Sequence, residues 1–350
     1  MSFQLNQNPG RTVQLDGRER LFFSGYSYLG MSHVPEFCDL VKAGIDQYGI
    51  VFPSSRISNT QLELYRSFEY VLSRLVDTEQ TVTFSSGYLA GRAIAELLIK
   101  HNKHVFRAPD THPAIQCGIQ LPVEDWKNHF LKTINLSGHN SFVLFMDGVN
   151  PLSASVANFS FLHEINADQH LTIVVDDSHG IGLLGAEGEG ISHLIPRLHN
   201  VEVVITYSLS KAFHLNGGAV SCSKKIALLL RDSPFYTASS AISPALVYAF
   251  LNGQYYYHLQ LKKLQENIAA FINVISDIGG ICFYPYLPVF VLKRNWDPAY
   301  FEKQNIIISS FAYPDPWGNK VNRIILNALH TRQDLFKLSG VLNTLQQNSY

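Results

Sequence analysis

A lysine between small polar residues is the most chemically suggestive side chain in this sequence. Lys211 ends the run Ser208–Lys211, which follows a short apolar segment and precedes the glycine pair Gly217–Gly218. Most lysines are solvated surface side chains, but this position favours a lysine held at a strand end. Asp176 follows a second apolar segment, residues 171–175. Taken alone, Asp176 is equally compatible with a simple loop carboxylate or a cap.

Two further features complete the requirements of one cofactor chemistry. Pyridoxal phosphate (PLP) needs a lysine amine for a Schiff base, a carboxylate at its pyridine nitrogen, donors for its phosphate and a partner on its ring face. Gly87 and Tyr88 open a helix directly after an apolar strand, which favours an anion there. His112 follows another strand end. Each signal is weak alone, but together with Lys211 and Asp176 they predict a PLP site.

Two competing motifs overlap this region of the sequence. Residues 180–185, GIGLLG, match the dinucleotide fingerprint and follow a strand. That fingerprint requires a helix that opens within the glycines, whereas residues 186–190 are too rich in glycine to begin one. Two aspartates and a histidine in residues 176–179 could ligate a metal, but no Glu or His at i+4 spacing supports them. Both interpretations are weaker than the PLP site, and we expect no metal.

Short apolar strands that alternate with helices must position these residues. The spacing of apolar residues predicts helices over about 61–76 and 88–100, with Thr60 and Glu63 as a capping box for the first. Strands are expected at 81–84, 104–107, 142–146, 171–175, 201–206 and 218–221. This alternation predicts an α/β fold with a mainly parallel sheet. Ligands of such sheets bind beyond the carboxyl ends of the strands.

Length and composition predict two unequal domains and exclude several classes of protein. We expect an N-terminal segment 1–45, a large cofactor-binding domain 46–245, and a long helix over 245–275 that leads into a small α+β domain within 246–350. Basic residues (27) nearly balance acidic ones (28), which argues against nucleic-acid binding. No apolar run could span a membrane and no signal peptide is recognised. Four widely spaced cysteines indicate a reduced, cytoplasmic protein.

The quoted motifs resemble the α-oxoamine synthase family of fold-type-I PLP enzymes, which includes 8-amino-7-oxononanoate synthase and 2-amino-3-ketobutyrate CoA ligase. The run VDDSHGIGLLG at 175–185 is similar to that family's VDDAHGTGVLG, and SLSKA at 208–212 resembles its lysine motif. FSSGY at 84–88 matches outright, and YLG at 28–30 and Ser55-Arg56 resemble its N-terminal motifs. The resemblance runs from about residue 26 to 330. It implies the PLP-dependent transferase fold with a smaller C-terminal domain.

The resemblance implies a role for each matched residue around the cofactor ring. Lys211 would carry the Schiff base and move the proton at the substrate Cα. Asp176 would pair with the pyridine nitrogen, and His179 would hydrogen-bond the phenolic oxygen. His112 would stack on the ring face.

The resemblance also implies how the phosphate and the substrate are bound. The amides of Gly87 and Tyr88 and the hydroxyl of Ser208 would hold the phosphate, while Ser239 and Ser240 would reach the phosphate of the neighbouring subunit. In a separate motif near the C-terminus, PWG at 316–318, Arg323 and His330 have the family's spacing. Arg323 would bind the substrate carboxylate through its planar fork, with an exposed strand arginine as the alternative.

The function implied by the resemblance is that of a homodimeric acyltransferase with a shared active site. It would condense a small amino acid with an acyl-CoA-type thioester and release carbon dioxide. Another PLP reaction, such as transamination or aldol cleavage, and a PLP-binding protein without this activity are the alternatives. The sequence names neither the amino acid nor the acyl chain.

The sequence departs from the family pattern at three places. Ser27 stands where the family has asparagine, and Tyr65 replaces a common histidine. The loop 147–154, DGVNPLSA, stands where the family has EGVFSMDG, so Pro151 replaces a serine that touches the cofactor's phenolic oxygen. These departures leave the cofactor residues in place and bear on the substrate and on the acyl-transfer step.

Overall fold

The computed structural model describes residues 3–294, 296–313 and 315–347, and the chain divides into two compact units. The large unit consists of Asp39–Val149 and Val156–Gln254. The small unit consists of Met1–Cys38, Asn150–Ser155 and Tyr255–Tyr350. Helix α1 (Pro35–Tyr48) crosses one boundary, and the short paired strands β7 (Val149–Asn150) and β8 (Ser155–Val156) lie where the chain passes between units.

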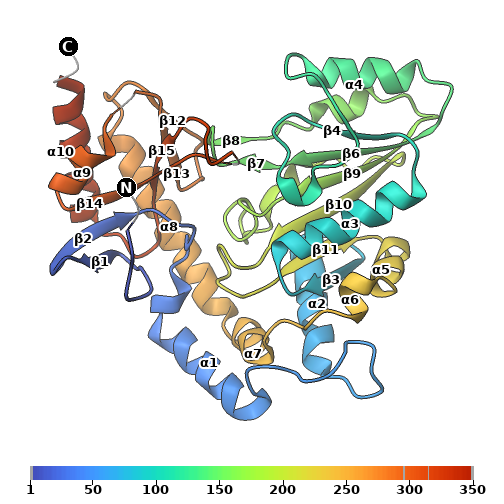
Figure 1. Ribbon diagram of the computed structural model, residues 1–350, viewed down its shortest axis with the longest axis horizontal. Coiled ribbons are helices and arrows are strands. Elements are labelled where there is room, and N and C mark those ends of the chain that lie inside the picture. Colours follow the sequence, from blue (N-terminus) through green and yellow to red (C-terminus); the bar gives the residue numbers. More distant parts are fainter. Residues whose placement is uncertain (1–2, 295, 314, 348–350) are drawn as a thin grey trace. The chain divides into compact units, whose positions relative to one another are not determined.

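The large unit is built on one seven-stranded sheet. Its strands are β3 (Gln80–Phe84), β4 (Val105–Arg107), β5 (Ile119–Gln120), β6 (Ser141–Asp147), β9 (His170–Asp176), β10 (Val201–Ser208) and β11 (Gly218–Cys222). They lie in the order β3-β11-β10-β9-β6-β4-β5, and only β11 runs antiparallel to its neighbours (Figure 1). Six of these strands were predicted to within two residues, so the mainly parallel sheet is confirmed.

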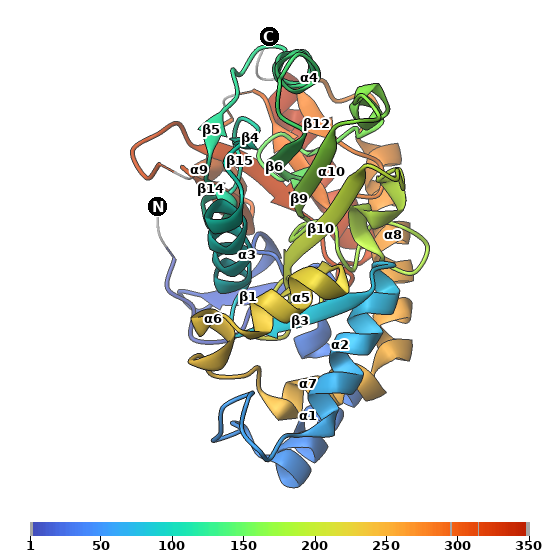
Figure 2. The same ribbon diagram turned by 90° about the vertical axis from the view of Figure 1, so that its right-hand side faces the viewer.

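Helices pack on this sheet through a shared apolar core. The helices of the large unit are α2 (Glu63–Leu75), α3 (Gly87–His101), α4 (Trp126–Asn135), α5 (Lys224–Arg231), α6 (Pro234–Thr237) and α7 (Pro244–Asn252), with 3₁₀ turns η2 (Pro113–Ile115), η3 (Ser160–Glu164) and η4 (Gly190–Leu194). Helices α3 and α5 pack against strands β10 and β3 of this sheet (Figure 2). Ile94 of α3 and Leu230 of α5 are fully buried in one cluster with Val174 and Val204 of the central strands. This buried apolar surface holds the strand ends in fixed register.

Two helix predictions need correction. Helix α2 begins at Glu63 after an N-terminal cap at Leu62 that uses no side chain, so the capping box of Thr60 and Glu63 is wrong. The hydroxyl group of Thr60 instead lies 3.5 Å from that of Ser58 in the preceding loop. The single helix expected over 245–275 is two helices, α7 and α8 (Gln254–Val274), because the chain leaves the helical conformation at Gly253, a residue that lowers helix stability.

The small unit is built on a six-stranded sheet. Its strands are β1 (Thr12–Leu15), β2 (Arg18–Phe23), β12 (Ile281–Phe283), β13 (Val289–Leu292), β14 (Ile306–Phe311) and β15 (Val321–Ile325), and its helices are η1 (Met31–His33), α8, α9 (Pro298–Lys303) and α10 (Arg332–Gln347). The strand order is β1-β2-β14-β15-β13-β12, with β2 and β14 parallel and the other pairs antiparallel. Phe271 of α8 packs edge-on against Phe290 of β13, with ring centroids 4.8 Å apart.

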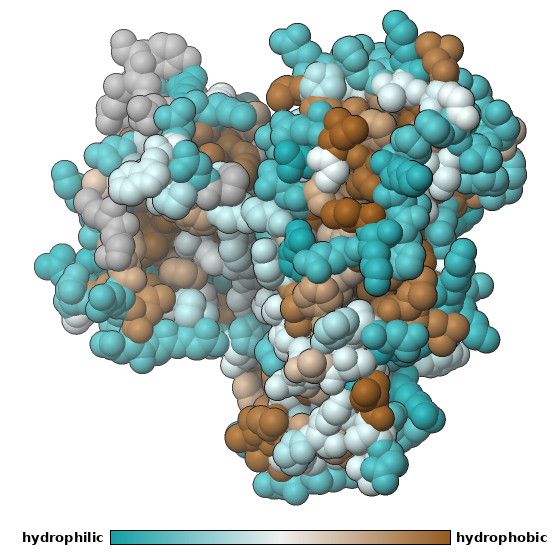
Figure 3. Space-filling model, turned by 45° about the vertical axis from the view of Figure 1, so that its right-hand side comes forward, coloured by the Kyte–Doolittle hydropathy of each residue, from teal (hydrophilic) through white to brown (hydrophobic). Residues whose placement is uncertain are grey.

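Three further findings concern the surface, membrane-spanning helices and the cysteines. On the face shown in Figure 3, apolar side chains lie in small groups between hydrophilic ones. Among the described residues no helix is long and apolar enough to cross a membrane. The four cysteines are all free thiols.

Candidate active site

The carboxyl ends of three neighbouring parallel strands bring the predicted catalytic residues together. Asp147 at the end of β6 is the register partner of Asp176 at the end of β9, and Asp176 is in turn opposite Thr206 of β10. Strand β10 then leads through Ser208 to Lys211. The sheet register thus places acidic side chains from two strands beside the turn that carries the lysine.

The environment of Lys211 suits an amine that must react. Burial lowers the pKa of Lys211, while Asp176, Asp147 and Asp177 act in the opposite direction by stabilising its charged form. A desolvated amine gives up its proton more readily than an exposed lysine does, and nearby carboxylates keep the proton within reach. This combination is what Schiff-base chemistry requires of a lysine.

His112 is held as a neutral imidazole beside Asp176. Its Nδ1 lies 3.7 Å from Asp176 Oδ2 and accepts a hydrogen bond from the Ala114 amide at 3.2 Å. Because Nδ1 accepts, the ring proton lies on Nε2. Burial lowers the pKa of His112 and outweighs the opposite effect of Asp176. The ring is therefore flat and neutral at neutral pH. Asp176 Oδ1 accepts the Ser178 amide at 2.9 Å, which fixes the carboxylate plane.

The N-terminus of α3 packs closely against Ser208 and forms a cradle that could hold an anion. Helix α3 begins at Gly87, and the hydroxyl of Ser86 caps it by accepting the Leu89 amide at 3.1 Å. A Cβ atom at Gly87 would lie 2.6 Å from Ser208 Cβ, so only glycine allows this approach. The Ser208 hydroxyl lies 2.8 Å from that of Ser210. Helix N–H groups and two hydroxyls therefore converge where a phosphate would fit.

The glycine-rich segment after β9 is a structural loop, and it carries His179. Asp177 is fully buried, and its Oδ2 accepts the Ile191 amide at 2.9 Å. Gly190 has φ +71° and packs so closely on this carboxylate that a side chain would collide with it. His179 lies in the first turn of this loop. No α-helix opens in residues 180–189, so the dinucleotide interpretation is excluded.

Ser239, Ser240 and Tyr88 contribute less to the site within one chain. The Ser239 hydroxyl donates to the Phe235 carbonyl, and Ser240 is exposed. Neither serine shares a hydrogen bond with the strand-end residues in the described part of the chain. The Tyr88 side chain is 57% exposed, which leaves only its backbone amide for the α3 cradle.

Arg323 lies in the small unit, on the central strand β15, and it is 1% exposed. Its guanidinium lies over the Phe311 ring, 4.9 Å from the centroid. Its nitrogens donate to the Pro151 carbonyl at 3.5 Å and to the Ser309 hydroxyl at 3.4 Å. It forms no ion pair with any residue that the structure describes. The exposed-arginine alternative is therefore wrong, because this is a buried cation held by weak neutral acceptors.

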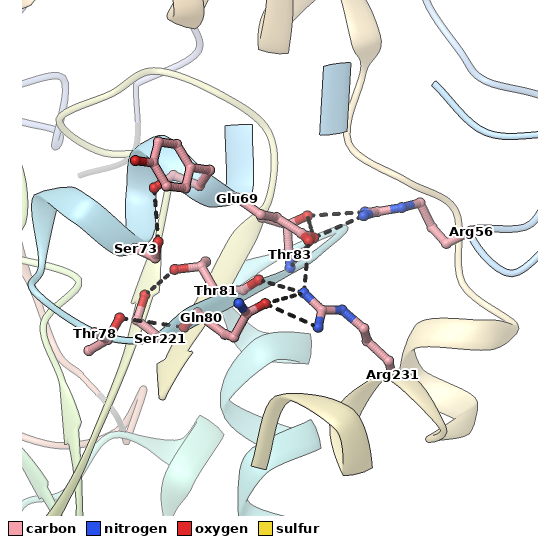
Figure 4. A network of polar contacts seen from close by, with 10 residues as sticks. Arg56, Glu69, Ser73, Thr78, Gln80, Thr81, Thr83, Ser221 and Arg231 are labelled. Carbon is pink, nitrogen blue, oxygen red and sulfur yellow. Dashed lines mark hydrogen bonds and ion pairs between the residues drawn. The ribbon is translucent and has the colours of Figure 1, made fainter. Parts of the chain in front are cut away.

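A second buried polar centre in the large unit was not foreseen. Glu69 of α2 binds Arg56 at 2.9 Å through Oε1 and Arg231 at 3.3 Å through Oε2, and both guanidiniums point toward it in Figure 4. Thr83 of β3 donates to Oε1 from both its amide and its hydroxyl, at 3.0 and 2.8 Å. Arg56 also lies 4.5 Å from the centroid of the Tyr65 ring. The two guanidiniums thus share the one carboxylate of Glu69.

The residues of the Glu69 network are far apart in the sequence, so no local pattern reveals it.

Asp147 was within reach of sequence reasoning, because it directly follows a predicted strand just as Asp176 does. Among the described residues no group of three or more His, Cys, Asp and Glu side chains could hold a metal ion.

Comparisons with known proteins agree with this geometry. Residues 24–338 match the family "Aminotransferase class I and II". An 8-amino-7-oxononanoate synthase of Buchnera aphidicola subsp. Baizongia pistaciae is 26% identical over 95% of this chain and 91% of that relative. A serine palmitoyltransferase of Sphingobacterium spiritivorum is 23% identical over 91% of this chain and 84% of its own. The solved structure of the Sphingomonas wittichii serine palmitoyltransferase superposes with a TM-score of 0.82 at 17% identity, covering 99% of this chain and 92% of that one.

The chain belongs to the aminotransferase class I and II family and is a PLP-dependent enzyme. The fold-type-I architecture predicted from the sequence is confirmed, and so is the resemblance to the α-oxoamine synthases. The strand-end residues fit the cofactor by their own chemistry, since a desolvated lysine, a fixed carboxylate, a neutral ring and an anion cradle occur in one region.

Proposed function

We propose that the protein is an acyltransferase that condenses a small amino acid with an acyl-CoA-type thioester, with loss of carbon dioxide. Lys211 would hold the cofactor covalently and move the proton at the substrate Cα. Asp176 would face the cofactor's ring nitrogen, and His179 its phenolic oxygen. The cradle at the start of α3, made of the Gly87 and Tyr88 amides and the Ser208 hydroxyl, would hold the phosphate. When bound, PLP supplies an electron sink for the Cα carbanion.

One observation carries most of this proposal, namely the crowding of carboxylates around one buried lysine. Lys211 is acted on by three aspartates while burial lowers its pKa. Structural lysines are not kept in such surroundings, because an exposed position avoids the desolvation. The amino-acid substrate follows from Arg323, a buried guanidinium without a carboxylate partner in the described chain. The thioester co-substrate rests on the similarity to α-oxoamine synthases.

The homodimer and a cytoplasmic location are part of the same proposal. The Ser239 hydroxyl donates to the Phe235 carbonyl and Ser240 is exposed, which is compatible with a segment that reaches the phosphate of a second subunit. Two-fold dimers are also the commonest assembly. The free cysteines are consistent with a reducing compartment. A monomer that is fully active at assay concentration would refute the shared site.

The experiment that tests the reaction is to mix the purified holoenzyme with single amino acids and an acyl-CoA. Release of the CoA thiol together with carbon dioxide, dependent on one small amino acid, is the expected result. Conversion of the cofactor to pyridoxamine phosphate without thiol release would instead establish an aminotransferase. Absence of Cα–H exchange with every small amino acid would favour a PLP-binding protein without this activity.

A further inference from the structure

Asp147 is a strand-end carboxyl group to which the proposed reaction gives no task. Its Oδ1 accepts the main-chain amide of His112 at 3.0 Å. Other hydrogen bonds of the loop that carries His112 go to main-chain oxygens. The Ala108 amide donates to the Phe145 carbonyl at 2.8 Å, and the Thr111 hydroxyl donates to the Ala108 carbonyl at 2.6 Å. Asp147 thus holds the His112 backbone through its side chain.

The backbone is constrained on both sides of His112, so one hydrogen bond to the amide between them can fix the position of this residue. Asp110 adopts a left-handed conformation with φ 57°, and Pro113 fixes the start of η2 directly after the histidine. The ring is then oriented locally, since the Ala114 amide donates to Nδ1. A hydrogen bond to the His112 amide therefore determines where the whole imidazole lies relative to Asp176, 3.7 Å away.

A buried carboxyl group is an energetically unfavourable acceptor at this position. Asp147 and Asp176 are register neighbours, and burial together with the Asp176 charge raises the pKa of Asp147 to about 8. Lys211 acts in the opposite direction, and Asp110 adds to the repulsion. A side chain with an amide oxygen would accept the same bond without this repulsion. A glutamate here would carry its carboxyl group one methylene further from the strand and so place the acceptor differently.

We infer that Asp147 is a positioning residue of the cofactor site, which sets the place of the His112 ring by holding its main-chain amide. This inference rests on the proposed function, in which His112 stacks on the cofactor. It predicts that Asp147 matters through its acceptor oxygen and through His112. It also predicts that the longer glutamate does not substitute for aspartate unless the His112 loop shifts.

A double-mutant cycle on PLP affinity tests this inference. Asp147→Ala should raise the dissociation constant of PLP by about three- to tenfold, the typical worth of one hydrogen bond. Asp147→Asn retains an acceptor oxygen and should stay within about twofold of wild type. In a His112→Ala background, Asp147→Ala should add little, because residues that act through one another are not additive. Asp110→Asn, which removes a neighbouring charge but leaves the acceptor oxygen of Asp147 in place, is the matched control.

The outcomes separate this inference from the proposed function. If His112→Ala leaves PLP affinity unchanged, the stacking role fails and the proposed site must be revised. If His112→Ala weakens binding but Asp147→Ala does not, or if the two effects simply add, Asp147 is not the positioning residue. Should Asp147→Ala fold poorly, Asp147→Val also removes the acceptor, leaves no void and suits a strand, and the cycle is run with it.

Discussion

The large unit contains two buried acidic centres that solve the same electrostatic problem in opposite ways. Glu69 is 6% exposed and has two arginines and a threonine as partners (Figure 4). The strand-end centre has Asp147, Asp176 and Asp177 around the single cation Lys211. Buried charges are stable when paired. The first centre is therefore arranged for stability, whereas the second places three carboxyl groups beside one cation and raises the pKa of Asp147 and Asp177, an arrangement that stability alone does not explain.

Two arginines, Arg56 of the large unit and Arg323 of the small unit, show the same contrast. Arg56 is buried against a carboxylate at 2.9 Å. Arg323 is buried even more completely, but its partners are a carbonyl and a hydroxyl at 3.4–3.5 Å. A cation with such weak partners can accept a carboxylate from outside the chain, whereas Arg56 cannot. Incomplete pairing of buried charge distinguishes the candidate functional residues from structural ones.

The largest effect is expected at the fully paired centre. Glu69→Ala should lower the free energy of unfolding by about 3–5 kcal/mol, because it leaves Arg56 buried without an opposite charge. Glu63→Ala on the same helix is the control, since Glu63 is 76% exposed and pairs with Arg66 only at 3.6 Å. It should cost less than about 1 kcal/mol. Denaturant unfolding measures both, and equal losses would contradict the contrast drawn here.

At the strand-end centre the opposite behaviour is expected. Asp176→Asn removes one of several repelling carboxylates, so the free energy of unfolding should change by less than about 1 kcal/mol. The rate at which the holoenzyme exchanges the Cα–H of its amino-acid substrate should fall by about a hundredfold or more. Proton exchange followed by NMR measures this rate. Near-normal exchange would remove Asp176 from its role.

Arg323 provides a third comparison, between the binding of the amino acid and the binding of the cofactor. Arg323→Ala should weaken amino-acid binding by about 1.5–3 kcal/mol, the worth of a hydrogen bond to a charged group, and leave the cofactor spectrum unchanged. Arg323→Lys should rescue only in part, because a point charge cannot reproduce the planar fork. Amines without a carboxylate serve as the control and should bind wild type and variant alike. Unaltered amino-acid affinity in the alanine variant would make Arg323 structural.

The last comparison concerns the pH dependence of stability. The pKa of Asp147 is about 8 in the folded protein, against about 3.9 in an unfolded chain. Between these values the folded state binds a proton that the unfolded state lacks, so this contribution to stability is present at low pH and is lost as the pH rises toward 8. Asp147→Asn should remove this slope in unfolding experiments on the cofactor-free protein. A variant that keeps the wild-type slope would show that Asp147 is ionised throughout.

Local patterns were sufficient to predict the large sheet and its strand-end residues. Short apolar runs such as Phe142–Met146 clearly predict strands when each is followed by polar residues, and Asp176 and Lys211 lie in the polar segments that follow two such runs. The small unit was harder, because β2 pairs with β14 across almost the whole chain. The Glu69 network had no local signal for the same reason, since Arg231 reaches it from α5. Contacts between distant segments depend on tertiary packing, which residue spacing does not encode.

The central claim is that Lys211 carries the cofactor, and one measurement tests it directly. The holoenzyme should be yellow, and reduction with borohydride followed by peptide mapping should place the pyridoxyl label on Lys211. Lys224 and Lys225 follow closely in the sequence but open helix α5, away from the strand-end carboxylates, and provide the internal control. A label on either of them, or no label at all, would contradict the account.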